Sequence, residues 1–340
     1  MWRNSRNHRT RSIGAALVRF SGILILAWLA IIPATSAQSR PIPLQRDQTI
    51  GETVADRSSA YYRFERLVVS SPDHARSWRI TLGVPRAAPP ANGYAGFWML
   101  DGNAALMEFD PALLSELAMR PPQLLVFVGY DNEQRVDIPA RTRDYTPTAT
   151  LSGELGQEVP AGGGADAFLE TLERMIWPEV ARRVPLDPQQ QTLWGHSFGG
   201  LFTLYTLYTR GGLFQTYAAA SPSLWWDDGY MLGGPEQRFV ANNAGHRAHV
   251  LLMLGGDERY PQQNGRDLND ARVIAHMKRV AAVPSDSALR LSERLRQVPG
   301  LAVDYREFPG MSHGPMLRAS LLYALHAVTG IADHSGEPRP

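Results

Sequence analysis

The feature of this sequence that most constrains its fold is the run Gly195-His-Ser-Phe-Gly-Gly200, together with the apolar segments on either side. Residues 192–194 have the character of a buried strand, and residues 201–208 have that of a helix. The glycines allow the backbone to turn sharply from strand to helix, with Ser197 at the apex. The pattern G-x-S-x-G alone is weak evidence, but a strand–turn–helix context presents a nucleophilic serine. We therefore predict that Ser197 is a nucleophile; the alternative is a structural turn with an inert serine.

Short apolar segments alternate with helical patterns along most of the chain. The predicted buried strands are 96–100, 123–128, 192–194, 217–220, 250–254 and 303–308. The predicted helices are 111–119, 165–183, 201–208, 268–280, 286–297 and 315–328. This alternation is typical of an α/β protein with a mostly parallel central sheet and helices on both faces. We expect residues 62–70 and 77–84 to add antiparallel N-terminal strands, and residues 129–163 to form a long polar connection.

The first 37 residues have the pattern of a secretory signal peptide. They contain arginines but no acidic residue, an apolar run at 22–32, and small residues before Ala37. An uncleaved membrane anchor is the alternative, but an apolar run of about 11 residues is too short to span a bilayer comfortably. We expect cleavage at Ala37 and a periplasmic protein without a stable membrane span. The remainder is predicted to be a polar lead-in at 38–60, a single domain at 61–330 and a flexible tail at 331–340.

Charge and cysteine usage exclude several classes of partner. The net charge is +1, and the basic excess lies in the N-terminal segment, so no nucleic-acid partner is expected. The chain has no cysteine. His246 and His249 stand three residues apart, but a zinc site needs further ligands that the sequence does not supply. We therefore expect a small-molecule substrate, no metal and no cofactor.

A serine nucleophile needs a base, and the base needs an orienting group. Enzymes with this strand–turn–helix element carry the three in the order serine, acid, histidine. His313 follows the last predicted strand and precedes the last predicted helix, which makes it the candidate base. Asp257 and Glu258 follow the strand at 250–254, and either could orient the histidine; we favour Glu258, and a Ser–His dyad without an acid is the third possibility. His196 is expected to pack beside the turn.

Two backbone N–H groups are the expected donors for the oxyanion that forms during acyl transfer. One belongs to Phe198, directly after the nucleophile. The other is expected from the loop after the strand at 96–100, where we favour Asn103, with Gly102 as the alternate. A simple turn without a catalytic role is the alternative for this loop.

Several runs resemble a known family, the esterase D-like hydrolases of the α/β-hydrolase fold. Within it the chain is similar to the periplasmic enterobactin and salmochelin trilactone esterases, over residues 45–330. The runs that carry the resemblance are Leu100-Asp-Gly-Asn-Ala104, Asp144-Tyr-Thr-Pro147, Gly195-His-Ser-Phe-Gly-Gly200, Ser221-Pro-Ser-Leu-Trp-Trp226 and Ser312-His-Gly-Pro315. The resemblance implies hydrolysis of the serine trilactone of catecholate siderophores, apo or iron-loaded, with Ser197 as nucleophile and His313 as base. It leaves the acid open, because the family contains both triads and dyads.

The resemblance also implies that Arg141 contacts the substrate. A ferric tris-catecholate is a trianion with flat aromatic rims, so its site should offer cations and aromatic faces. Arg143, Trp225 and Trp226 are the further candidates. The alternatives are that the tryptophans belong to the core and that Arg143 pairs with Asp144.

Other functions share these motifs. A broad carboxylesterase for acylated sugars or xenobiotics is the nearest rival, and an acyltransferase could use the same turn. A thiol-ester hydrolase is disfavoured by the predicted signal peptide. The rival from another class is a periplasmic binder of ferric siderophores without catalysis, and turnover of any activated ester would exclude it.

Overall fold

The computed structural model describes residues 48–147, 162–243, 245–260 and 269–330. All of them belong to one compact unit, Leu44–Pro340. The predicted signal peptide, the start of the lead-in and the C-terminal tail lie outside the described residues. Within those residues, no helix combines the length and the apolar character that crossing a membrane requires.

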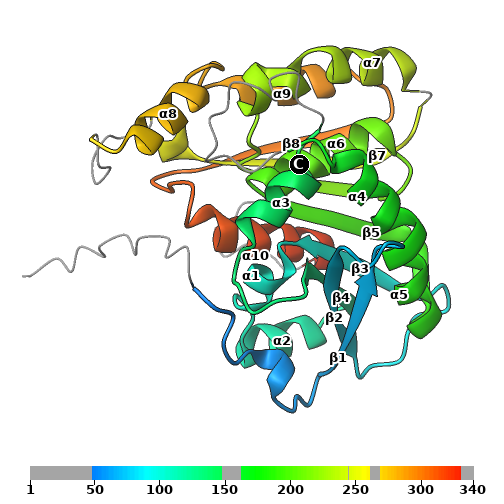
Figure 1. Cartoon of the computed structure of the whole chain (residues 1–340). Helices are drawn as coiled ribbons and strands as arrows, with labels where there is room; N and C mark the ends of the chain where they lie inside the picture. The colour runs from blue at the N-terminus through cyan, green and yellow to red at the C-terminus, as the bar shows by residue number, and fades with distance from the viewer. Residues whose placement is uncertain (1–47, 148–161, 244, 261–268, 331–340) are drawn as a thin grey trace, which may run out of the picture. The chain divides into compact units, whose positions relative to one another are not determined.

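The core of the fold is an eight-stranded sheet in the order β1-β2-β4-β3-β5-β6-β7-β8 (Figure 1). The strands β1–β2 and β2–β4 pair antiparallel, and all other neighbours pair parallel. This confirms the predicted mostly parallel sheet with antiparallel N-terminal strands. The strands are β1 (Tyr62–Ser70), β2 (Ser77–Pro85), β3 (Tyr94–Leu100), β4 (Gln123–Tyr130), β5 (Leu186–His196), β6 (Thr216–Ala220), β7 (Ala248–Gly255) and β8 (Leu301–Phe308).

Helices cover both faces of the sheet because its strands bury side chains on both sides. In β3, for example, Trp98 packs into one apolar cluster and Phe97 and Met99 into the other, as the alternation of side chains along a strand requires. The first cluster is covered by α4 (Ala165–Thr171), the π-turn η2 (Leu172–Ile176), α5 (Trp177–Arg183), α6 (Phe198–Thr209), α7 (Gly234–Asn242) and α9 (Ser287–Leu295).

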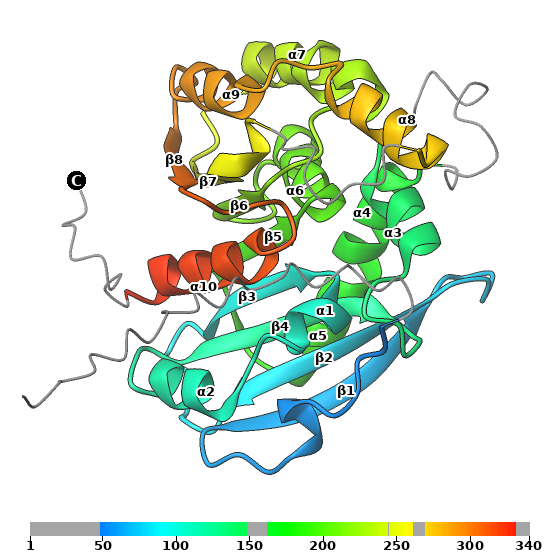
Figure 2. The same ribbon diagram turned by 90° about the vertical axis from the view of Figure 1, so that its left-hand side faces the viewer.

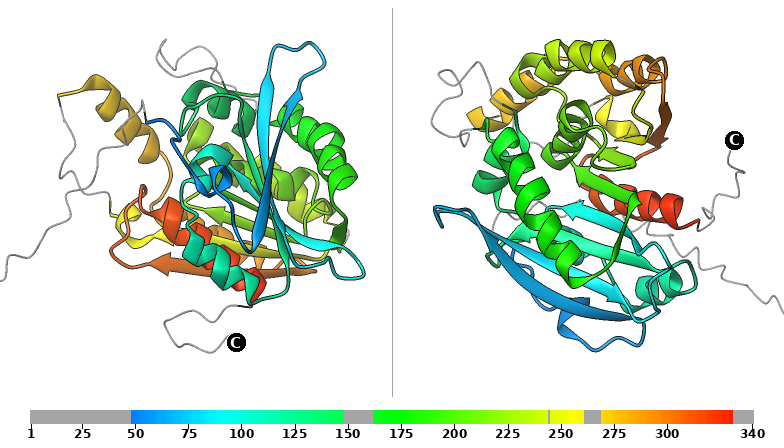
Figure 3. Two further views of the ribbon diagram at one scale, coloured as in Figure 1. Left: turned by 90° about the horizontal axis from the view of Figure 1, so that it is seen from below. Right: turned by 90° about the vertical axis from the view of Figure 1, so that its right-hand side faces the viewer.

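The second cluster is covered by α1 (Gly102–Leu106), α2 (Pro111–Ala118) and α10 (Met316–Thr329). Figure 2 shows α2 and α10 on the opposite side of the sheet from α4 and α5. In the right panel of Figure 3 the continuous green helix formed by α4, η2 and α5 crosses one face of the sheet. The remaining elements are η1 (Val54–Asp56), α3 (Ile138–Tyr145), η3 (Trp226–Leu232), η4 (Gly256–Glu258) and α8 (Ala271–Val280).

Residues 48–60, the part of the predicted lead-in that the structure describes, pack on the domain. Thr49 forms a bridge with Gln134, and Ile50 and Val54 are buried. A capping box between Thr53 and Asp56 begins η1. Ile50 and Val54 are isolated apolar residues in a polar segment and form no periodic pattern. The sequence therefore did not reveal this packing.

The connection at 129–163 also differs from the expectation, because it contains α3. The helix begins where the Asp137 carboxylate accepts the N–H of Ala140, with Pro139 in the first turn. Its buried residues are mostly polar: Arg141, Thr142, Asp144 and Tyr145. A helix whose buried face is polar has no hydrophobic period to detect.

Candidate active site

Ser197 stands at a strained turn between β5 and α6. Its backbone has φ 62° and ψ −117°, a conformation that costs a residue with a side chain about 1–3 kcal/mol. Gly195 is required in this turn because a Cβ atom there would overlap the carbonyl oxygen of Gly199. The Ser197 N–H donates to the carbonyl of Ala220 at 2.9 Å, which fastens the turn to the end of β6. The sequence therefore forms the predicted strand–turn–helix element with the serine at its apex.

The structure brings Glu258 and His313 into direct contact. Oε2 of Glu258 lies 2.5 Å from Nδ1 of His313, and the Glu258 side chain is 15% exposed. Its other oxygen, Oε1, accepts the Ser221 hydroxyl at 2.5 Å and the Gly255 N–H at 3.0 Å. Burial raises the pKa of Glu258, but the hydrogen bond and charge of His313 and these two donors outweigh it, so the net pKa is lowered. An ionised carboxylate therefore faces the imidazole at neutral pH.

Asp257, the alternate acid, is placed differently. Its backbone N–H donates to the carbonyl of Met311 at 3.1 Å and so ties the β7 loop to the loop that carries His313. The described residues contain no hydrogen bond from the Asp257 side chain to His313. Of the two adjacent acids, the structure places Glu258 against the candidate base.

Among the described residues, the hydroxyl of the candidate nucleophile has Ser223 as its hydrogen-bonding partner. Its Oγ lies 3.3 Å from Oγ of Ser197, and its N–H donates to the Ser197 carbonyl at 3.2 Å. Among the described residues no hydrogen bond joins the Ser197 hydroxyl to His313. Catalytic hydrogen bonds are often long without substrate and tighten in the complex. Sequence reasoning missed Ser223, because nothing in the run that contains it marks a hydroxyl directed at another loop.

His196 supports the loop that carries the candidate base. Its Nε2 lies 2.9 Å from the carbonyl oxygen of His313, and the two imidazole rings are 4.6 Å apart. Burial lowers the pKa of His196 well below its usual value, and the charges of His313 and Arg141 add to this effect. His196 is therefore neutral, and since a carbonyl can only accept, its proton lies on Nε2.

The expected oxyanion donors lie at the start of two helices. Phe198 is the first residue of α6, and N–H groups in the first turn of a helix have no partner within it. Asn103 lies in α1, and its side-chain amide donates to the carbonyls of Tyr130, Asn132 and Gln134, which leaves its backbone N–H as the candidate donor. A Cβ atom at Gly102 would lie 2.6 Å from the backbone of β4, so only glycine fits there.

Arg141 is buried beside the serine turn, and its guanidinium is held by protein groups. The residue is 9% exposed and forms a bidentate pair with Asp101, Nε to Oδ1 at 2.9 Å and Nη2 to Oδ2 at 2.8 Å. Nη2 also donates to the carbonyl of His196 at 3.3 Å, and the guanidinium stands over the Phe198 ring. Burial lowers the pKa of Arg141, but the charge and hydrogen bond of Asp101 raise it by more than burial lowers it. The net pKa is therefore raised. Arg141 thus joins the α1 loop to the serine turn.

Arg143 pairs with its neighbour. Its Nε donates to Asp144 at 3.1 Å, and Asp144 is buried, with Arg76 and the Trp78 indole as further donors. The Arg143 side chain nevertheless remains 43% exposed. This is the arrangement given above as the alternative for Arg143.

The two tryptophans differ in exposure. Trp226 is 3% exposed and packs edge-on against Phe198, which is the core position given above as the alternative for the tryptophans. Trp225 is half-buried, with its ring 5.7 Å from that of Phe198 and 5.3 Å from that of His276 in α8. Trp225 is therefore the tryptophan that retains an accessible ring near the candidate nucleophile.

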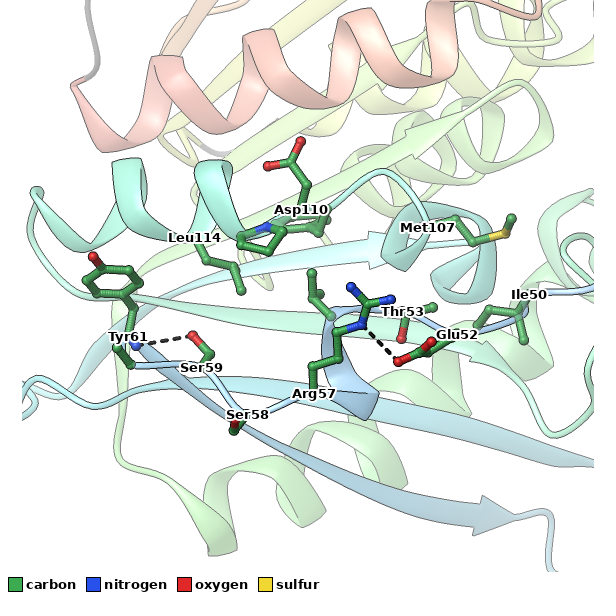
Figure 4. A pocket seen from close by; sticks show the side chains of 14 residues that line it. Ile50, Glu52, Thr53, Arg57, Ser58, Ser59, Tyr61, Met107, Asp110 and Leu114 are labelled. Carbon is green, nitrogen blue, oxygen red and sulfur yellow. Dashed lines mark hydrogen bonds and ion pairs between the residues drawn. The ribbon is translucent and has the colours of Figure 1, made fainter.

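Other candidate sites lie apart from these residues. His249 pairs with Asp304 at 2.8 Å. Within the described ranges no three His, Cys, Asp or Glu residues are grouped so as to hold a metal ion. A pocket of about 360 Å³ lies between η1 and α2, and Figure 4 shows the Arg57–Glu52 pair at its edge and Met107 and Leu114 in its wall. None of the predicted site residues lines this pocket.

With this geometry, the comparison with known proteins decides the family. Residues 71–321 match the family model named Esterase, described as "Putative esterase". The chain belongs to this esterase family. It is 31% identical to the apo-salmochelin esterase of Escherichia coli O6:H1, over 83% of this chain and 84% of that protein. It is 30% identical to the ferri-bacillibactin esterase BesA of Bacillus subtilis, over 83% and 96% of the two chains.

A solved structure of similar sequence gives the same result for the fold. The enterobactin hydrolase IroE in complex with DFP matches with a TM-score of 0.63 and 31% identity, over 82% of this chain and 99% of that chain. The comparisons confirm the predicted α/β-hydrolase fold and the predicted class of carboxylic ester hydrolase.

Proposed function

We propose that this protein is a serine esterase that hydrolyses the ester bonds of a siderophore, and specifically of a catecholate trilactone. The observation that carries the chemistry is the Glu258–His313 contact at 2.5 Å beside the strained turn of Ser197. The relatives named for salmochelin and bacillibactin support the siderophore class.

The positions of these residues give each of them a role in ester hydrolysis. His313 accepts the proton of the Ser197 hydroxyl while Oγ attacks the ester carbonyl carbon, and Glu258 stabilises the resulting imidazolium. The backbone N–H groups of Phe198 and Asn103 receive the oxyanion. The tetrahedral intermediate expels the alcohol oxygen, which takes the proton from His313 and leaves an acyl-enzyme. Water then attacks that ester by the same steps, which releases the acid and restores the serine.

Two partly exposed side chains suit a catecholate. The half-buried Trp225 ring offers an aromatic face close to Phe198, and Arg143 offers a partly exposed cation. A ferric tris-catecholate presents negative charge and flat rings to such groups. Hydrolysis of more than one ester bond of the trilactone cuts a hexadentate ligand into smaller pieces that hold iron less tightly, so such hydrolysis would aid iron release.

The proposed location is the periplasm. The support is the N-terminal sequence, in which arginines precede a short apolar run and small residues.

The test is incubation of the protein with enterobactin, with and without iron, followed by mass spectrometry of the products. Wild type should release linear trimer or shorter fragments, and the Ser197→Ala variant should release none above background. Turnover of p-nitrophenyl acetate without any cleavage of enterobactin would contradict the siderophore proposal and favour a broad carboxylesterase. Siderophore binding with no hydrolysis of any ester would favour the non-catalytic binder.

A further inference from the structure

Ser221 is a buried serine in a backbone conformation that serine rarely adopts. It follows β6, is 2% exposed and has φ 42°. Its N–H donates to the carbonyl of Met253 at 2.7 Å, so the backbone there is held by the neighbouring strand. Glycine would adopt this conformation without the cost that a side chain adds. The backbone conformation alone therefore does not explain why a serine occupies this position.

The hydroxyl of Ser221 supplies the explanation. It lies 2.5 Å from Oε1 of Glu258, and because an ionised carboxylate can only accept, the serine is the donor. Oε1 also receives the Gly255 N–H at 3.0 Å, while Oε2 faces His313. One oxygen is thus held by two donors, and the other is turned toward the imidazole. Without the Ser221 hydroxyl, Oε1 would be held by the Gly255 N–H alone.

The same loop also reaches the candidate nucleophile. Two residues after Ser221, the backbone N–H of Ser223 donates to the carbonyl of Ser197. A segment of three residues therefore connects the serine turn with the acid, which are on different strands.

We infer that Ser221 is a positioning residue that fixes the carboxylate of Glu258 for its contact with His313. The inference rests on the proposed function, since it assigns Glu258 the orienting role. Ser221 does not touch the reacting atoms; it acts through the acid. Loss of its hydroxyl should therefore slow the chemical step and leave binding of a small ester unchanged.

The experiment measures hydrolysis of p-nitrophenyl acetate by wild type, Ser221→Gly and Ser221→Ala. Both variants should lose about 10- to 100-fold in kcat, the loss expected for one hydrogen bond to a charged group, with KM changed less than about 3-fold. The melting temperature of Ser221→Gly should stay close to that of wild type, because relief of the positive φ offsets the loss of the hydrogen bond to Glu258. A purely structural serine would instead lower Tm. His74→Gly is the matched control, because His74 has φ 55° in an exposed turn and should leave kcat unchanged.

A double-mutant cycle separates positioning of the acid from a general effect. In a Glu258→Gln background, Ser221→Gly should cost less than about 3-fold, because the group that it positions has already been altered. Losses that multiply in the double variant, or a normal kcat in both single variants, would overturn the inference. Wild type that hydrolyses no ester would contradict the proposed function, whereas an active wild type that needs Ser197 but tolerates Ser221→Gly would contradict only this inference.

Discussion

The buried imidazole of His196 holds the main chain of His313, with Nε2 2.9 Å from the carbonyl oxygen. The residue next to the nucleophile in sequence is therefore a hydrogen-bond donor to the loop of the candidate base. This contact and the tie from Asp257 to Met311 hold that loop from two sides. The side chain of His313 itself stays partly exposed, at 44%. The loop is thus fixed through its backbone while the ring remains accessible to a substrate.

Ser197→Ala should lower kcat by about 10⁴-fold or more, because the variant lacks the oxygen that attacks the ester. The fold should be preserved, which circular dichroism and thermal melting would check. Ser77→Ala is the control, since the Ser77 hydroxyl bonds to that of Ser70 at the far edge of the sheet. Near-normal turnover of an activated ester by Ser197→Ala would exclude the serine mechanism.

Glu258→Gln and Asp257→Asn should have unequal effects. A neutral amide in place of the Glu258 carboxylate could no longer stabilise the imidazolium, so we expect a loss of about 10²- to 10⁴-fold in kcat. Asp257→Asn should cost less than about 3-fold, because the bond of Asp257 to Met311 uses the backbone, which the substitution keeps. Steady-state kinetics of both variants on p-nitrophenyl acetate shows which of the two acids orients His313. Two small losses would favour a Ser–His dyad.

His196 should make the protein less stable in mild acid. Its pKa is lowered in the folded state, first by burial, so below the unfolded value of about 6.5 the unfolded chain binds the extra proton and the folded chain resists it. The free energy of unfolding should therefore fall as the pH drops below about 6.5, and this part of the slope should be absent in His196→Gln. Urea unfolding at several pH values between about 5 and 8 measures it. His74→Gln, in an exposed turn, should keep the wild-type slope; an unchanged slope in His196→Gln would refute the assignment.

Arg141→Ala should damage stability and should slow all substrates alike. Removing one partner of a buried ion pair leaves Asp101 without its cation, which typically costs about 3–5 kcal/mol. The link between the α1 loop and the carbonyl of His196 is lost as well. Chemical denaturation and parallel kinetics on enterobactin and p-nitrophenyl acetate test this. A loss confined to enterobactin would instead support the direct substrate contact that the family resemblance implies.

Trp225→Ala should weaken recognition of the catecholate selectively. Loss of one aromatic face that stacks on a ring costs about 0.5–1.5 kcal/mol beyond its area, so KM for enterobactin should rise about 3- to 10-fold or more. The KM for p-nitrophenyl acetate, which has no catechol, should change little. Trp225→Phe is the matched variant and should retain most of the affinity. Equal effects on the two substrates would indicate that Trp225 only supports Phe198.

The parts of the site that could be predicted are encoded by residues close together in sequence. The turn around Ser197 has its glycines within the same short run, and the position of His313 follows from the order of strands and helices. The sequence favoured Glu258 but left Asp257 open, because the directions of the two side chains on a short turn depend on contacts with other loops, such as that of Glu258 with Ser221.

The parts of the fold that were missed have polar interiors or few apolar anchors. The helix α3 buries Arg141, whose partner Asp101 is 40 residues away in sequence. Local periodicity does not report such a pair, since the partner of a buried charge can lie anywhere along the chain. The expectation that Arg141 contacts a substrate came from the family resemblance, which does not report its pairing with Asp101.

The sheet order places β5, β6, β7 and β8 side by side, and Ser197, Ser221, Glu258 and His313 follow these four strands in that order. Their final distances are set by the loops: β5 and β8 are three strands apart, yet the loop after β8 brings the carbonyl of His313 to 2.9 Å from Nε2 of His196. Trp225 and Arg143 stand outside this row, in segments that leave the sheet. The groups that cut the ester thus start from the ends of four neighbouring strands and are brought together by loops and hydrogen bonds, whereas the partly exposed side chains proposed to select the substrate stand beyond them.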